Sequence, residues 1–182
     1  AAPRMSQVPT GQRVRLAVGI TGHRGGGGTQ GVDEAPVAAA LAGIIDRIEA
    51  GLATTRAASP SLQIQPTRLH SLLAPGVDQL AAIAAERRGW EIVAPLPFGR
   101  RLNVAINAQP HTHADGLALL AGAHAVDARV QARAQAIIRC SERARLFELA
   151  DRDVAITALF QAMLASPHDA ACARHFHAAA AA

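Results

Sequence analysis

Three short apolar segments, separated by helical patterns, constrain this chain more than any other feature. They are VRLAVGI at 14–20, RLHSLLA at 68–74 and WEIVAPL at 90–96, each followed closely by Gly or Pro. Runs of this length with flanking turn residues are typical of buried strands. Between them, apolar residues recur at helical spacing over 33–53, and residues 77–88 have high helix propensity. This order predicts parallel strands with right-handed crossovers, an α/β, Rossmann-like three-layer fold with a mostly parallel sheet flanked by helices.

The second half of the chain is predicted to be mostly helical. A polar segment at 54–65 reads as a linker, and RLFEL at 145–149 as a fourth strand. At 182 residues, half of them hydrophobic, the chain has the length of one domain. We predict an N-terminal tail over 1–12, a domain over 13–165, and a C-terminal tail or incomplete segment over 166–182. Further helices are expected at 99–108, 114–123, 125–140 and 153–165.

The composition indicates which classes of binding partner and which cellular compartment to expect. No apolar run approaches the roughly 18 residues of a membrane helix, and no apolar stretch of a secretory signal precedes the first strand. Cys140 and Cys172 are too few for a disulfide framework, which favours the cytoplasm. The net charge of +4 rests on Arg alone, and four Phe and one Trp offer few stacking platforms. We therefore expect neither a membrane nor a nucleic-acid partner.

Polar and Gly- or Pro-containing segments follow the three predicted strands at 21–24, 71–79 and 97–100. In an open parallel sheet, ligands bind beyond the carboxyl ends of strands, near the point where the strand order reverses. Backbone N–H groups at a helix start, preceded by a glycine, attract phosphate through aligned dipoles and close approach. Gly76 and the helix that begins at Val77 have this pattern. The sequence therefore predicts a phosphate-bearing ligand at this edge of the sheet.

Three motifs in order resemble the SLOG superfamily, which includes the DprA-like, YpsA-like and LOG proteins. The motifs are GITGHR at 19–24, SLLAPGVDQLAAIAA at 71–85 and IVAPLPF at 92–98, and RLFELADRDVAITALFQAML also looks like a segment of such proteins. The resemblance implies a Rossmann-like fold that binds nucleotides or nucleotide-derived molecules. The ligand-facing candidates that match position by position are Thr21, Gly22, His23, Arg24, Ser71, Gly76, Asp78 and Pro97.

The individual roles of these residues stay open between two interpretations. Arg24 could pair with a phosphate or be a solvated arginine, and Asp78 could accept a ribose hydroxyl or stabilise the helix start. His23 could donate a proton near neutral pH, but no partner carboxylate follows from the spacing. The other histidines in loops and near the end lack Cys or acidic partners at ligand spacing, so no metal and no further cofactor are predicted.

The motifs favour one function over two alternatives. The preferred hypothesis is a non-catalytic domain that binds or senses a nucleotide-derived small molecule. A LOG-like hydrolase of the N-glycosidic bond of nucleoside monophosphates is one alternative, although nothing here matches the PGGxGTxxE motif of those enzymes. A DprA-like single-stranded DNA binder is the other. Many members of the superfamily self-associate, so the resemblance also allows a homodimer.

Overall fold

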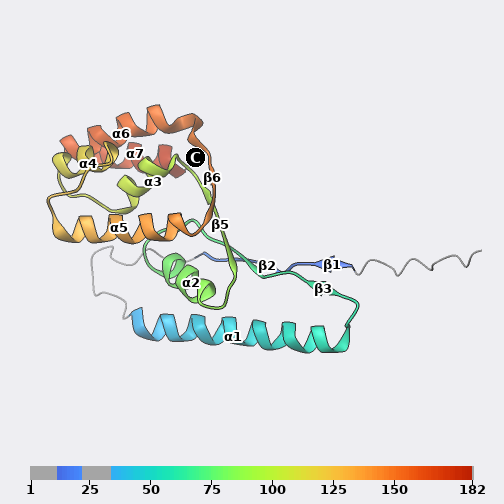
Figure 1. The fold of residues 1–182 in the computed structure, drawn as a ribbon. Helices are drawn as coiled ribbons and strands as arrows, with labels where there is room; N and C mark the ends of the chain where they lie inside the picture. The colour runs from blue at the N-terminus through green and yellow to red at the C-terminus, as the bar shows by residue number, and fades with distance from the viewer. Residues whose placement is uncertain (1–11, 22–33, 182) are drawn as a thin grey trace, which may run out of the picture.

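A four-stranded parallel sheet organises the structure, a computed structural model that describes residues 12–21 and 34–181. Its strand order is β2-β4-β5-β6, and every neighbouring pair is parallel (Figure 1). The strands are β2 (Ala17–Gly19), β4 (Arg68–His70), β5 (Glu91–Leu96) and β6 (Arg145–Glu148). Two further short strands, β1 (Arg13–Val14) and β3 (Gln63–Ile64), pair with each other in a separate parallel ladder.

Helices connect and flank these strands, which confirms the α/β, Rossmann-like fold with a parallel sheet. Figure 1 shows α3, α4, α6 and α7 gathered beyond β5 and β6, away from α1. The helices are α1 (Glu34–Ala58), α2 (Val77–Glu86), α3 (Arg100–Asn107), α4 (His113–Leu120), α5 (Ala128–Glu142), α6 (Asp153–Ala165) and α7 (Ala170–Ala181), with a 3-10 turn, η1 (Ala150–Arg152), before α6.

Several predicted element boundaries were wrong. The strand predicted over 68–74 ends at His70 as β4. The apolar run at 14–20 divides into β1 and β2, which pair with different strands. Helix α1 continues to Ala58, through half of the predicted linker at 54–65. The hydroxyls of Thr54 and Thr55 donate to the carbonyls of Ala50 and Gly51, at 3.0 and 2.9 Å, so these polar side chains bond within the helix instead of ending it.

One face of the sheet packs against α1 and α2. Val18, Leu69 and Ile92 lie side by side in register on this face. Helix α2 covers them with four buried alanines, Ala81, Ala82, Ala84 and Ala85. Because alanine has only a methyl side chain, the axis of α2 can approach the strands closely. This close approach places the start of α2 next to the end of β4.

A second apolar cluster joins the helices of the C-terminal half. Phe160 of α6 and Phe176 of α7 are each 2% exposed, and their rings lie 5.4 Å apart. They pack with buried residues of α3, α4 and α5. Residues 170–181, where the sequence pattern gave no element, form α7 because Phe176 anchors it to this cluster. The predicted domain boundary at 165/166 falls between α6 and α7.

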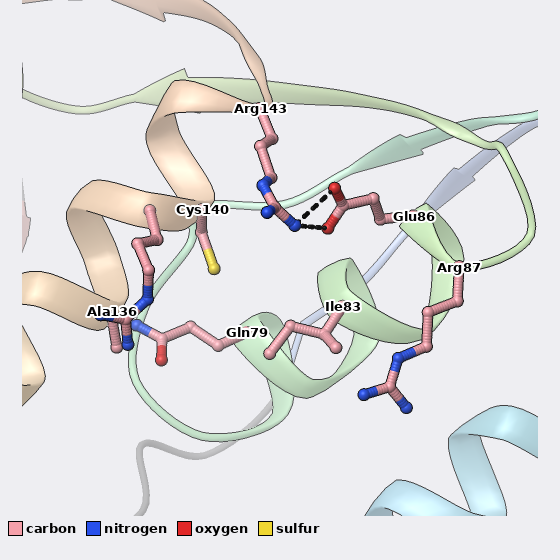
Figure 2. Close-up of a pocket in the computed structure, with 8 residues that line it drawn as sticks. Gln79, Ile83, Glu86, Arg87, Ala136, Cys140 and Arg143 are labelled. Carbon is pink, nitrogen blue, oxygen red and sulfur yellow. Dashed lines mark hydrogen bonds and ion pairs between the residues drawn. The ribbon is translucent and has the colours of Figure 1, made fainter.

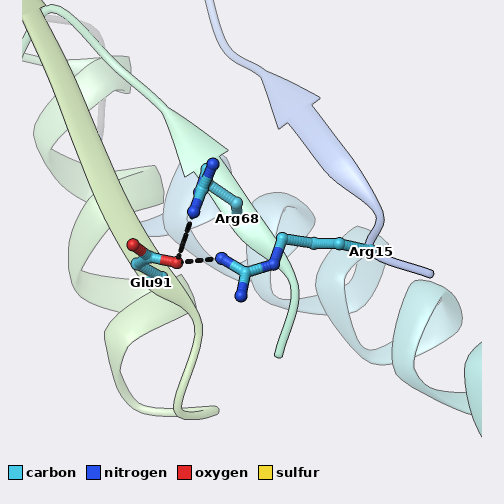
Figure 3. Close-up of polar contacts among 3 residues, drawn as sticks. All are labelled: Arg15, Arg68 and Glu91. Atoms are coloured by element: carbon cyan, nitrogen blue, oxygen red, sulfur yellow. Dashed lines mark hydrogen bonds and ion pairs between the residues drawn. The ribbon is translucent and has the colours of Figure 1, made fainter. Parts of the chain in front are cut away.

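The opposite face of the sheet carries charged side chains at the amino end of β5. Figure 3 shows Arg15 and Arg68 converging on one oxygen of Glu91, with Arg68 Nη2 at 3.0 Å from Oε2. The hydrogen bond from Arg68, with a further contribution from Arg15, lowers the pKa of Glu91 below its ordinary value of 4.5. A lowered carboxylate pKa stabilises the fold above the pKa of the unfolded chain, and this contribution is lost as the pH falls.

We therefore predict that Glu91→Gln flattens the acid side of the stability profile. The thermal midpoint of the wild type should fall as the pH is lowered through about 4, and that of Glu91→Gln should fall less steeply. Differential scanning calorimetry between about pH 6 and 3 measures both slopes. The control is Glu142→Gln, because Glu142 makes only an exposed 3.7 Å contact to Arg100. Equal slopes in all three proteins would contradict the assignment.

Candidate functional site

The carboxyl ends of β2, β4 and β5 share one edge of the sheet, as expected for neighbouring parallel strands. Their order follows the sequence, so the described sheet has no point at which the strand order reverses. The described strands therefore provide no strand-order reversal next to the predicted site. The groups that could contact a ligand at this edge belong to the loops and helix starts that follow the strands.

The predicted site residues occupy different positions at this edge. Thr21 is exposed and follows β2, whereas Gly22, His23 and Arg24 lie outside the described residues. Ser71 and Asp78 are buried, at 2% and 5% exposure, on the two sides of the loop between β4 and α2. Gly76 is the N-cap of α2, and Pro97 is exposed directly after β5. The structure thus brings Ser71, Gly76 and Asp78 into one loop.

Internal hydrogen bonds fix the shape of this loop. The Ser71 hydroxyl accepts a bond from the Leu73 N–H at 3.1 Å and lies 3.4 Å from the Asp78 carbonyl oxygen, to which it donates. Gln79 Nε2 donates to the Leu73 carbonyl at 3.4 Å. Leu73 is fully buried and has a φ of 56°, a conformation that non-glycine residues rarely adopt. The loop is therefore held in one strained shape by its own side chains.

The two helices that start at this edge differ in how their first N–H groups are satisfied. At the start of α3, the Gly99 N–H lies 3.0 Å from each Asp153 carboxylate oxygen, and the Arg100 N–H donates to Glu148 at 2.7 Å. At the start of α2, the N-cap is Gly76, with a φ of 98°, and no described side chain caps the helix. The first N–H groups of α3 are bonded by the protein's own carboxylates, whereas no side chain of the described residues is recorded as capping α2.

This difference determines which of the two helix starts is a candidate for binding an anion. The first N–H groups of a helix have no partner within the helix, and the aligned peptide dipoles make that end positive. A phosphate or carboxylate can accept hydrogen bonds there. With no side chain on Gly76, an anion can approach the backbone closely. Asp78, in the first turn, adds a buried carboxylate next to this position.

A separate cavity of about 440 Å³ lies between α2 and α5 (Figure 2). Arg143, the C-cap of α5, bonds both carboxylate oxygens of Glu86 of α2, at 2.8 and 2.9 Å, and this ion pair links the two helices. Cys140 also lines the cavity, and burial, with the nearby Glu86 charge, raises the pKa of its thiol. A raised pKa keeps the thiol protonated near neutral pH, so it is a poor nucleophile.

Sequence reasoning missed the carboxylates that fill the start of α3. Asp153 and Glu148 lie 54 and 48 residues from their partners in the chain. No local pattern marks a side chain that caps a helix so distant in sequence, because standard capping motifs lie within the first turn.

Comparisons with known proteins identify no relative. No family model matches the chain, and no match was found among curated proteins or solved structures. Within the described ranges, no three His, Cys, Asp or Glu side chains group together as metal ligands, and no helix is long and apolar enough to cross a membrane.

The carboxylate at the start of α3 generates a stability prediction. Asp153→Ala should lower the free energy of unfolding by about 1–2 kcal/mol, because the buried Gly99 N–H loses its acceptor. Urea denaturation followed by circular dichroism measures this change. Asp151→Ala, an exposed position two residues earlier, is the control and should stay within about 0.5 kcal/mol of the wild type. If the two variants are equally stable, Asp153 does not cap α3.

Proposed function

We propose that this chain binds a nucleotide or a nucleotide-derived molecule at the carboxyl ends of β2, β4 and β5. The phosphate rests on the first turn of α2, against the backbone at Gly76. The observation that carries the proposal is the contrast between the two helix starts, where α3 is filled by Asp153 and Glu148 and α2 has no described side-chain cap. We therefore place the ligand anion at the start of α2.

The shape of the preceding loop supports the same position. Leu73 and Gly76 both have positive φ values, 56° and 98°, and the Ser71 hydroxyl ties the loop to the first turn of α2. Strained backbone costs stability and persists where the surroundings enforce it, often at ligand sites. A loop fixed in advance also loses less conformational entropy when a ligand binds.

The ordered SLOG-like motifs make nucleotides the preferred class of anion. The first motif contributes Thr21 at the end of β2 together with Gly22, His23 and Arg24, which lie outside the described residues. In this proposal Arg24 pairs with the phosphate, Asp78 accepts a ribose hydroxyl, and Pro97 borders the ligand. Because nothing in the sequence matches the PGGxGTxxE motif of LOG enzymes, binding or sensing is proposed rather than N-glycosidic hydrolysis.

Two glycines that flank α2 provide the experiment. Gly76→Val places a branched side chain at the phosphate position, and Gly89→Val introduces one at the other end of the helix. Both glycines have positive φ, 98° and 74°, so both variants should lose stability through strain. A thermal-shift screen with AMP, ADP, ATP and ADP-ribose should show a ligand that raises the midpoints of the wild type and Gly89→Val but not that of Gly76→Val.

Two results of the screen would reject the proposal. One is that none of the four nucleotides raises the wild-type midpoint. The other is that Gly76→Val responds as strongly as Gly89→Val, which would place the ligand elsewhere. Chromatography of a mixture of the chain and AMP then separates binding from turnover, because hydrolysis would release free adenine.

A further inference from the structure

A second cavity, of about 520 Å³, lies among α3, α6 and α7, beyond the end of β5. Its walls include side chains that are nine-tenths or more buried: Phe98, Ile106, Phe160 and Phe176. The tilted ring pair of Phe160 and Phe176, with centroids 5.4 Å apart, forms one side. Ligand pockets of proteins have this size and this mainly apolar lining with a few polar groups. The cavity therefore has the size and lining of a ligand pocket, and it opens to solvent beside the exposed Pro97 and His177.

The lining of this cavity carries no Arg, Asp or Glu among the described residues, in a chain with 18 Arg. Its polar side chains are those of Gln109 and His177, and the ring of His177 lies 5.1 Å from that of Phe176. Moving an ionised group from water into such a site costs free energy unless an opposite charge pairs with it. The walls therefore favour an uncharged, apolar ligand over the anion that fits the start of α2.

Gln109 provides an independent observation. It has a φ of 53°, which is strained for a residue with a side chain. Arg133 holds this backbone in place, donating to the carbonyls of Ala108 at 2.7 Å and Gln109 at 3.1 Å. The side-chain amide of Gln109 lines the cavity and takes part in none of the hydrogen bonds found among the described residues. A strained backbone thus presents an amide with one donor and one acceptor group at an apolar cavity.

We infer that this cavity is a binding site for a small uncharged molecule with an aromatic or short aliphatic body and one amide-like or carbonyl group. The body fills the space beside Phe160, Phe176 and Met163, and its polar group hydrogen-bonds the Gln109 amide. This cavity adjoins the proposed nucleotide site at Pro97, but the inference does not rest on that proposed function.

A matched pair of probes tests the inference on the intact chain. 1-Naphthamide and 1-naphthoate share one ring system, but only naphthoate is charged near neutral pH. Isothermal titration calorimetry at pH 7.5 should give naphthamide a Kd below about 1 mM, and naphthoate a Kd at least about tenfold higher. Equal affinities, or no saturable binding of naphthamide, would overturn the inference.

Three variants locate the probe. Ala180→Leu, which fills the cavity from α7, should weaken naphthamide binding at least about tenfold. Ala178→Leu, exposed on the same helix and outside the cavity lining, should bind like the wild type. Gln109→Gly relieves the strain of the positive φ, so its thermal midpoint should equal or exceed that of the wild type. The same variant lacks the side-chain amide, so it should bind naphthamide and naphthoate with equal affinity. Retained preference in Gln109→Gly, or equal losses in Ala178→Leu and Ala180→Leu, would also overturn the inference.

Discussion

The close packing of α2 on the sheet is the constraint on which the rest of the proposed site depends. Ala81 and Ala85, at 2% and 0% exposure, lie over a sheet face formed by Leu69 and Ile92. Since methyl side chains set this spacing, α2 is held next to the strands, and its first turn stays beside the end of β4. The same contact closes the loop in which Ser71 bonds to Leu73 and Asp78. Packing in the core thus determines where backbone donors lie at the edge.

The two helix starts at the sheet edge and the apolar cavity among α3, α6 and α7 are chemically distinct environments. At the edge of the sheet, the protein's own carboxylates bond the first N–H groups of α3, and we propose that an anion binds at the start of α2. Among α3, α6 and α7, the walls are apolar and the polar group is an uncharged amide. In this proposal the dipole of α2 attracts an anion to the start of that helix, whereas desolvation disfavours an anion in the apolar cavity.

The sequence predicted the parts of this structure that local patterns control. Apolar runs and helical periodicity predicted the parallel α/β sheet. Gly76 before Val77 predicted the start of α2, because the preference for glycine at a position of positive φ is a local property of the chain. Contacts between distant segments were not predictable: Asp153 caps a helix 54 residues earlier, and Phe176 orders α7 by packing on Phe160. The positive φ of Gln109 also has no local signal, since Arg133 holds it from another helix. Helix propensity alone does not predict where α1 ends, because the hydroxyls of Thr54 and Thr55 bond to carbonyls within the helix.

Backbone amide chemical shifts during titration with ADP test the central claim most directly, that the start of α2 is the anion site. We predict saturable shifts of the Val77 and Gln79 amides, while the Gly99 and Arg100 amides, which are bonded to Asp153 and Glu148, keep their shifts. Saturable shifts centred on the start of α3, or none at either helix start, would contradict it.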